Sequence, residues 1–307
     1  MIKEIDYSQA NCFLTCPRKY HNKYNLNLKK SDYDDTSVDK EFGSAAHCAL
    51  EAFYKKKGNP IDAFKAEFGD LKGEKLKTLD NGCFLIQSYL DRYTAQDRGW
   101  EILDVEVNDC IMIGNLKYIV KIDLIIKDRG NIYVVEHKTS SASGMWKQKF
   151  FKQFMLNTQV SGYTYYTTKR FGQCSGVIIN PLFMNTVKKP ILVDPSQVTA
   201  NGYYKDVETK YSKYYGKDMS YLSGFNCSFE RNMENRYPEQ LVDFETNVTT
   251  IAKRVNQCYE DNLWARNESS CTDFRGCEYI ELCLSCGDEQ IIETNYEVVD
   301  NKKYLKE

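Results

Sequence analysis

Two apolar runs, residues 122–126 and 132–138, contain three charged side chains, and this combination restricts the fold more than any other feature of the sequence. β-Branched and aromatic residues dominate both runs and a short glycine-containing turn separates them, so the pattern predicts two antiparallel strands joined by a hairpin. Asp123, Glu136 and Lys138 lie inside these strands. An unpaired charge is strongly disfavoured in a buried position, so the fold must bring compensating groups to these residues.

The chemistry of the three side chains indicates a metal site. If Asp123 and Glu136 converge where the two strands diverge, they offer the oxygen ligands that suit Mg²⁺ or Mn²⁺. Lys138 projects from the same face as Glu136, because side chains alternate along a strand. The trio favours metal-assisted phosphodiester hydrolysis. The alternative is structural: Asp123 forms a salt bridge with Lys138 or Lys121, and Glu136 lies on a solvated face.

Composition narrows the class of protein. A chain of 307 residues suffices for one large domain or two small ones. The formal net charge of -2 means that a polyanionic partner must be bound by a local basic patch. No apolar run reaches the length of about 18 residues that a membrane helix needs, and the N-terminus lacks the features of a signal peptide. We therefore expect a soluble, cytoplasmic protein with no membrane partner.

The twelve cysteines are distributed unevenly. Cys12 and Cys16 lie near the N-terminus, and four more lie within residues 271–286. Disulfides are rare in a reducing compartment, so this clustering favours a metal site. Four thiolates suit zinc and iron equally.

Several segments resemble motifs of the PD-(D/E)xK nuclease superfamily. Asp123 followed by Glu136-His137-Lys138 resembles its signature, and further segments resemble the motifs of its RecB-like branch in the family order. These segments are residues 16–20, residues 43–47, the pair Gln159 and Tyr163, and residues 271–283.

The resemblance implies a set of metal ligands. His47, Asp123, Glu136 and the main-chain carbonyl of His137 would bind one or two divalent ions, Mg²⁺ or Mn²⁺. Glu106 is the family's usual extra carboxylate, and its alternative is an ordinary surface strand residue. The side chain of His137 alternates to the other face and has no implied role.

Other residues would act around that metal site. The resemblance implies that Lys138 orients the attacking water or steadies the developing charge. Gln159 and Tyr163 are four residues apart on a predicted helix and so share a face. In the family the equivalent pair faces the active site and helps to place DNA.

The resemblance also implies a [4Fe–4S] cluster held by Cys16, Cys271, Cys277 and Cys283, with zinc as the alternative metal. Cys286 could replace Cys283. Five residues separate Cys271 from Cys277, and five separate Cys277 from Cys283, a spacing that we associate with phage and helicase-linked members of the family. For a phage-encoded chain, the compartment would be the host cytoplasm. Joining the chain ends closes a loop of about 255 residues, worth roughly 5 kcal/mol of chain entropy, which makes the cluster a structural clasp.

A basic segment with interleaved aromatic residues precedes the Gln159 helix. Lys147, Lys149 and Lys152 could neutralise phosphates while Trp146 or Phe150 stacks on unpaired bases, an arrangement suited to single-stranded nucleic acid. The alternative is a solvated helix start whose aromatic residues enter the core.

These observations predict one α/β domain over residues 1–307: a restriction-endonuclease-like core with a central mixed sheet flanked by helices. A helical insertion spans 48–100, with breaks near 58–60 and 81–82. The cysteine segment 265–287 closes onto residues 10–24, and a tail follows over 288–307. The remaining predicted elements are helices over 8–24 (capped by Ser8), 149–170 and 238–263, strands over 103–108, 111–114, 118–126, 176–182 and 188–193, a helix from Asp194, and a loop-rich segment at 220–235.

The resulting hypothesis is a Mg²⁺- or Mn²⁺-dependent deoxyribonuclease. We expect an exonuclease on single-stranded DNA or DNA ends, acting in recombination, repair or replication, with a protein partner from those processes. One alternative is a DNA-binding or assembly subunit that keeps the fold and the cluster without hydrolysing DNA, and another is a redox protein using the cysteines. The three buried charges of Asp123, Glu136 and Lys138 argue against an active site that has lost its activity.

Overall fold

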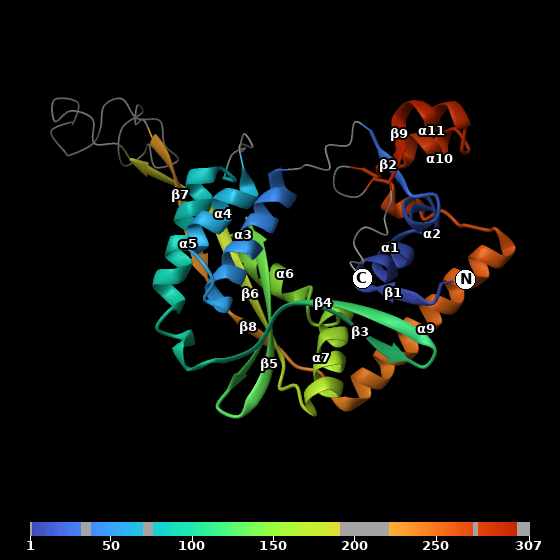
Figure 1. Ribbon diagram of the computed structural model, residues 1–307. Helices are drawn as coiled ribbons and strands as arrows, with labels where there is room; N and C mark the ends of the chain where they lie inside the picture. Colours follow the sequence, from blue (N-terminus) through green and yellow to red (C-terminus); the bar gives the residue numbers. More distant parts are fainter. Residues whose placement is uncertain (1, 32–37, 70–75, 191–220, 273–275, 300–307) are drawn as a thin grey trace.

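The computed structural model describes residues 2–31, 38–69, 76–190, 221–272 and 276–299. Its centre is a seven-stranded mixed sheet (Figure 1). Along the sheet, the main path runs through β1 (Glu4–Asp6), β4 (Leu116–Asp128), β5 (Asn131–Ser140), β6 (Val177–Pro190) and β7 (Tyr221–Phe229). Two strands branch from this path: β3 (Glu101–Ile113) pairs with β4, and β8 (Asn232–Glu234) pairs with β6.

The sheet combines an antiparallel meander with parallel pairs. β3, β4 and β5 form the meander that the sequence predicts, and the hairpin between β4 and β5 closes at Asp128 and Asn131. β5 then lies parallel to β6, and β1 lies parallel to β4. A parallel pair needs a crossover, which α6 (Met145–Lys152) and α7 (Thr158–Phe171) provide between β5 and β6. The predicted α/β class with a central mixed sheet is confirmed and is consistent with a restriction-endonuclease-like fold.

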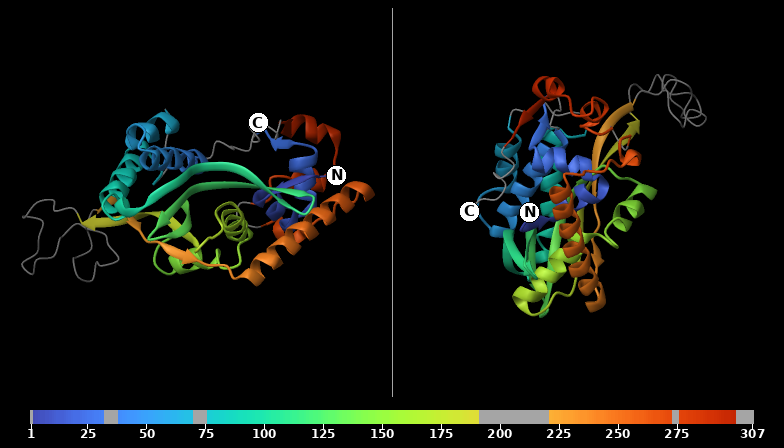
Figure 2. Two further views of the ribbon diagram at one scale, coloured as in Figure 1. Left: turned by 60° about the horizontal axis from the view of Figure 1, so that its bottom comes forward. Right: turned by 90° about the vertical axis from the view of Figure 1, so that its right-hand side faces the viewer.

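Helices cover both faces of the sheet (Figures 1 and 2). On one face they are α1 (Tyr7–Thr15), α7 and α9 (Pro238–Asp261). On the other they are α3 (Val38–Lys55), α4 (Pro60–Phe68) and α5 (Leu79–Tyr93). Each face has its own buried apolar cluster, so the sheet lies between two hydrophobic cores and contributes side chains to both.

The segments near the two chain ends meet beside the sheet. They contribute α2 (Pro17–Tyr20), α10 (Ile280–Leu284), α11 (Glu289–Asn295) and the antiparallel pair of β2 (Leu28–Lys30) with β9 (Tyr296–Val298). Tyr279 and Leu282 are buried there, and the Tyr279 hydroxyl donates to the main-chain carbonyl of Leu28 at 2.6 Å. Main-chain N–H of Arg18 donates to the carbonyl of Ala265 at 3.0 Å, which places the cysteine segment against the first helices.

The predicted helix over 8–24 is divided. Cys16 has an extended backbone and precedes Pro17, the first residue of α2. The residue before a proline is disfavoured in a helix, so α1 ends at Thr15. The N-terminal cap is Asp6 rather than Ser8, because Asp6 and Gln9 form a reciprocal capping box.

Other predicted boundaries also differ. The helix predicted over 149–170 is two helices, and Asn157 caps the second by accepting from the Gln159 N–H. The strands predicted over 103–108 and 111–114 are one strand, β3, because β4 pairs with it along most of its length. The loop-rich segment predicted at 220–235 contains β7 and β8, which pair with the long strand β6. The helix predicted from Asp194 lies outside the described residues.

Gly82 corrects the break predicted near 81–82. It lies inside α5, and a Cβ atom at this position would be 2.1 Å from Phe64 Cζ on α4. Glycine is therefore needed for the close approach of two helices rather than for a turn.

We predict that Gly82→Ala lowers the free energy of unfolding by about 1–3 kcal/mol, the usual cost of overpacking a core. The cost should exceed the helix-propensity advantage of alanine, about 1 kcal/mol. Chemical denaturation measures the change. The control is Gly99→Ala, whose Cβ would meet no atom within 4 Å and which should be nearly neutral. Equal stability of the two variants would contradict the packing argument.

Candidate active site

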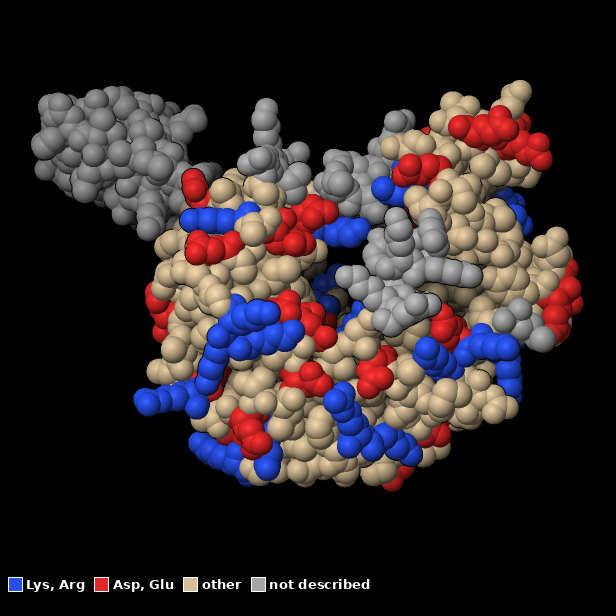
Figure 3. All heavy atoms as spheres, viewed as in Figure 1, with Lys and Arg blue, Asp and Glu red and all other residues tan. Residues whose placement is uncertain are grey.

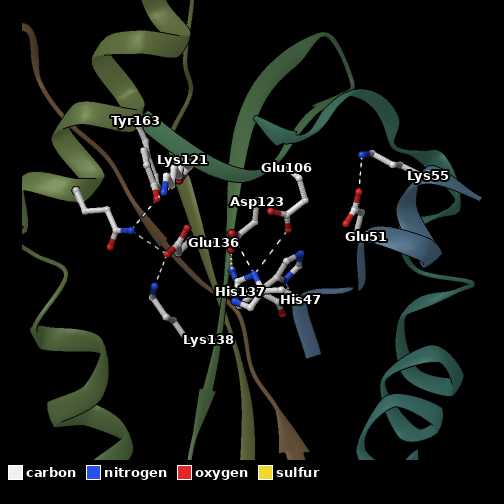
Figure 4. Close-up of polar contacts among 12 residues, drawn as sticks. His47, Glu51, Lys55, Glu106, Lys121, Asp123, Glu136, His137, Lys138 and Tyr163 are labelled. Atoms are coloured by element: carbon white, nitrogen blue, oxygen red, sulfur yellow. Dashed lines mark hydrogen bonds and ion pairs between the residues drawn. The ribbon is translucent and has the colours of Figure 1, made fainter. Parts of the chain in front are cut away.

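The candidate site lies where β4 and β5 stop pairing (Figure 4). Their ladder ends at the pair Leu124 and Val135, and Asp123 and Glu136 are the next residues along each strand. Beyond the ladder the N–H of His137 donates to Asp123 Oδ2 at 2.7 Å. The two carboxylates therefore occupy the point of divergence, as the sequence suggested.

His47 and Glu106 join Asp123 from other elements. His47 projects from α3, and its Nδ1 is 3.2 Å from Asp123 Oδ1 and 3.8 Å from Glu106 Oε1. One ligand atom from each of the three residues lies within 4.8 Å of the other two. Glu106 has a φ of 55°, and its neighbours Val105 and Val107 pair with β4 on either side of Asp123. This backbone irregularity sets Glu106 opposite Asp123.

The charges at the site perturb one another. Burial lowers the pKa of His47, but Asp123 and Glu106 outweigh burial and raise it to about 10. Burial raises the pKa of Asp123, yet His47 outweighs that effect and holds the pKa below its ordinary value. Burial and the charge of Asp123 raise the pKa of Glu136 to about 7. Two carboxylates in one buried space repel each other, and a divalent cation relieves that repulsion.

Lys138 and α7 hold the other side of Glu136. Lys138 forms an ion pair with Glu136 Oε1, not with Asp123 as in the structural alternative. Gln159 Nε2 donates to Glu136 Oε1 at 3.1 Å and to the Tyr163 hydroxyl at 2.7 Å. That hydroxyl in turn donates to the main-chain carbonyl of Lys121. The structure thus brings Gln159 and Tyr163, which share a face of α7 as their spacing predicted, to the carboxylate of Glu136.

Glu136 also has an oxygen that suits a metal ion. Its side chain is buried, and Oε2 has no hydrogen-bond donor among the residues that the structure describes. An unsatisfied buried acceptor is costly, so a cation at this oxygen would be favourable. The ligand atoms of His47, Glu106 and Asp123 form one close group that does not include Glu136, which lies beside Asp123 where the strands diverge. Carboxylates and one imidazole are donors that fit Mg²⁺ or Mn²⁺. His47 would have to lose its proton to bind the ion.

The side chain of His137 points to the opposite face of β5, as predicted, where sequence reasoning missed its partners. Burial lowers its pKa to about 3, and its Nδ1 is 2.8 Å from Asn180 Nδ2. Asp97 and Arg231 belong to the same buried polar group. Neither has a recognisable motif, because Asp97 lies in a short 3₁₀ turn and Arg231 in the connection from β7 to β8.

The basic segment on α6 is only partly available to a ligand. Trp146 is 63% exposed, with Lys149 Nζ 5.1 Å from its ring centre, and Lys152 is also exposed. Lys147 is instead bound to Ser228 Oγ at 2.8 Å.

The aromatic residues of this segment divide between surface and core. The ring centre of Phe150 is 5.3 Å from that of Phe183, so this partly buried ring packs against the core. Base stacking by Phe150 stays a prediction. On the face shown in Figure 3, acidic and basic side chains are intermixed around a central hollow, which agrees with a local rather than a global basic surface.

The predicted cluster cysteines are neighbours without forming a closed site. Burial raises the pKa of Cys283, and the charges of Cys277, Cys16 and Cys271 raise it further. No three cysteine sulfurs of the described residues lie within 4.8 Å of one another. The side chains therefore do not converge at the spacing that a single metal ion requires.

Comparison with known proteins identifies the family. The family model of the PD-(D/E)XK nuclease superfamily matches residues 5–284. The chain belongs to this superfamily. It is similar to a solved structure from Eubacterium rectale described as a "Putative exonuclease", with 11% identity, a TM-score of 0.49, and coverage of 93% of this chain and 94% of that chain. The search of curated proteins found no match.

Membership supports a metal-dependent nuclease, whose substrate class is nucleic acid. In the part of the chain that the structure describes, no helix is both long and apolar enough to span a membrane.

We predict that Mn²⁺ raises the thermal unfolding midpoint of the metal-free protein, because an ion that binds only the folded state stabilises it. At a concentration of 100 times Kd the gain would be about 2.7 kcal/mol. Glu136→Gln should lose most of this gain. Glu101→Gln is the control, since Glu101 is an exposed carboxylate 3.6 Å from Lys127. An identical Mn²⁺ response in both variants would exclude Glu136 as a ligand.

Proposed function

We propose that this protein is a Mg²⁺- or Mn²⁺-dependent deoxyribonuclease whose metal ligands are His47, Glu106, Asp123 and Glu136. The observation that carries the proposal is the meeting of Asp123 with Glu136 at the strand divergence, where Glu136 has a buried oxygen without a donor. The main-chain carbonyl of His137 would complete the ligand set. A bound ion of this kind polarises the phosphate and lowers the pKa of the attacking water.

The protein's own residues would position the reactants. Lys138 is partly exposed beside Glu136, so its ammonium can hold the attacking water or the developing negative charge. Gln159 fixes one oxygen of Glu136 and is itself oriented by Tyr163. The other oxygen of Glu136, Oε2, accepts no hydrogen bond from the described residues and would bind the ion.

We predict that Asp123→Ala and Glu136→Ala abolish DNA cleavage, because each removes a ligand. Lys138→Ala should slow cleavage by about 10²–10³-fold, the usual effect of losing one charge-stabilising donor. Cleavage of labelled DNA with Mn²⁺, Mg²⁺ or EDTA measures the rates, and circular dichroism checks the fold. Lys127→Ala, at the far end of β4, is the matched control. A Lys138→Ala protein that cuts at the unaltered rate would refute the assignment.

We propose that the substrate is single-stranded DNA or a DNA end and that the activity is exonucleolytic. The exposed Trp146 and the lysines beside it support this proposal, because an aromatic face with flanking cations suits unpaired bases. Linear and circular DNA, each single- and double-stranded, distinguish the alternatives. Cutting of circular DNA would overturn an obligate requirement for ends, and binding without cleavage would favour an assembly subunit in recombination or replication.

We predict that the double variant Lys149→Ala/Lys152→Ala weakens DNA binding and flattens its salt dependence. The logarithmic slope should fall by about 0.7 per lost phosphate contact on a single strand, so by about 1.4. Lys147→Ala should change the slope less, because Lys147 is already bound to Ser228. The control is Lys65→Ala on α4, an exposed lysine away from α6. An unchanged slope in the double variant would place the DNA path elsewhere.

We also propose that Cys16, Cys271, Cys277 and Cys283 hold an iron–sulfur cluster. A single zinc ion with Zn–S distances of about 2.3 Å needs sulfurs about 3.8 Å apart, and no three cysteine sulfurs among the described residues are that close. A four-iron cluster binds each thiolate to a different iron and so accepts a wider spacing. Contacts between the two chain ends already bring these residues into one neighbourhood.

We predict that anaerobically purified protein carries about four iron atoms per chain. Cys16→Ser should lose the iron, whereas Cys258→Ser, on α9, should keep it. Metal analysis and visible absorption measure the content. Stoichiometric zinc without iron would refute the cluster, and iron lost from Cys286→Ser but kept in Cys283→Ser would exchange those two ligands.

A further inference from the structure

A buried polar group lies on the face of β5 opposite to Glu136 and Lys138. It begins at the His137 side chain, which is 3% exposed, and continues through residues of five other elements or connections. Its members far apart in the sequence are joined by hydrogen bonds. They are His137, Asn180, Tyr89, Tyr54, Asp97 and Arg231.

The directions of these hydrogen bonds follow from one fact: an arginine side chain can only donate. Arg231 Nε donates at 3.1 Å to the oxygen of the Asn180 amide, which fixes the orientation of that amide. The Asn180 Nδ2 therefore donates at 2.8 Å to His137 Nδ1. Because His137 Nδ1 must accept, the ring proton of the neutral imidazole lies on Nε2.

The rest of the group is determined in the same way. Tyr89 accepts from Asn180 Nδ2 at 2.8 Å and from Arg231 Nη2 at 3.1 Å, so its own proton goes to Tyr54 at 2.7 Å. Tyr54 donates onward to Asp97 Oδ2 at 2.8 Å. Arg231 closes the circuit by donating to both oxygens of Asp97, at 2.6 and 2.7 Å. The Arg231–Asp97 pair thus fixes the direction of each hydrogen bond in this group, from Asp97 to His137.

This group is anchored directly behind the candidate metal site. The ring of His137 stacks on Tyr54, and His137 pairs with Asn180 across the parallel strands β5 and β6. On the other side, the main-chain N–H of His137 holds Asp123 Oδ2. A shift of the His137 ring would therefore move the main chain that joins Glu136 to Lys138.

We propose that Arg231, Asp97 and Asn180 are positioning residues: they fix the His137 proton on Nε2 and hold residues 136–138 in the geometry that the metal site needs. The second half of this inference rests on the proposed function, and the first half does not. Mutation of residues that hold the groups around a metal site in place typically changes metal affinity or activity by about 10- to 100-fold.

The proton position can be measured on metal-free protein. The chain has three histidines, so the ¹⁵N–¹H correlation spectrum of labelled imidazoles is simple to assign. We expect the Nε2–H form for His137 in the unaltered protein. Asn180→Asp replaces the amide donor by a carboxylate acceptor and should move a proton to Nδ1 of His137. The spectrum of His21, the residue that follows α2, should stay unchanged. Nδ1–H in the unaltered protein, or no response to Asn180→Asp, would overturn the assignment.

Arg231→Lys tests whether Arg231 is what fixes the ring proton of His137 on Nε2. Lysine keeps the charge against Asp97 but lacks the fork that also holds Asn180. We expect a mixture of His137 tautomers in this variant. A pure Nε2–H form would show that Arg231 is not required.

Hydrogen exchange of the His137 amide tests whether the polar group restrains the main chain of residues 136–138. Asn180→Leu should speed hydrogen exchange of the His137 amide at least ten-fold. The control is Val135→Ala, which removes a buried side chain from the same face of β5 and leaves the polar group intact. Equal acceleration in both variants would mean a general loss of stability and would overturn the positioning role.

Calorimetry with Mn²⁺ then connects the group to the site. We expect Asn180→Leu to weaken Mn²⁺ binding by about ten-fold, and Val135→Ala to leave it nearly unchanged. Unaltered affinity in Asn180→Leu would refute the link to the metal. If the unaltered protein bound no Mn²⁺, the proposed function and the link to the metal would both fail, while the tautomer and exchange results would still decide the hydrogen-bonded group.

Discussion

The charge of Asp123 is held by a main-chain N–H, and the rest of the site depends on that interaction. Within a ladder the N–H of His137 would be used by the neighbouring strand. Because β4 and β5 stop pairing after Leu124 and Val135, this N–H is available to a side chain and donates to Asp123. The divergence of the strands therefore creates the space for two carboxylates and also supplies a donor for one of them.

β5 connects two polar groups of different kinds. Glu136 and Lys138 face the candidate metal site, where α7 supplies the support through Gln159. His137, between them, faces a hydrogen-bonded polar group that includes Arg231. Since neighbouring residues of a strand share one rigid backbone, constraint on one face restricts the other. This relation gives a physical reason for placing a buried arginine where an apolar residue would fill the same space.

The chain ends are joined independently of the sheet. A small apolar cluster including Tyr279 and Tyr296 and the β2–β9 pair bring the first thirty residues against the last described ones. The same junction collects Cys16 and Cys283 in one neighbourhood. Contacts of this kind close a very long loop, which is where a covalent or metal link restricts the unfolded chain most.

The sequence by itself determined the antiparallel meander and the position of α9, because apolar periodicity and turn residues act locally, and the resemblance of its motifs to a known superfamily implied the fold class. It also indicated that Asp123 and Glu136 meet, since charges inside buried strands require compensation. The breaks within 8–24 and 149–170 were less accessible, because caps such as Asp6 and Asn157 compete with other plausible caps nearby. Gly82 shows most clearly what the sequence does not reveal, because its role depends on Phe64, a residue of another helix.

Only the tertiary structure decided which groups compensate the charges. The partner of Lys138 is Glu136 and that of Asp123 is His47, a choice that depends on how α3 packs on the sheet. Asp97 and Arg231 have no local pattern, yet their pairing across 134 positions sets the proton of His137. Hydrogen-bond direction and burial arise from contacts distant in sequence, and no periodicity along the chain records them.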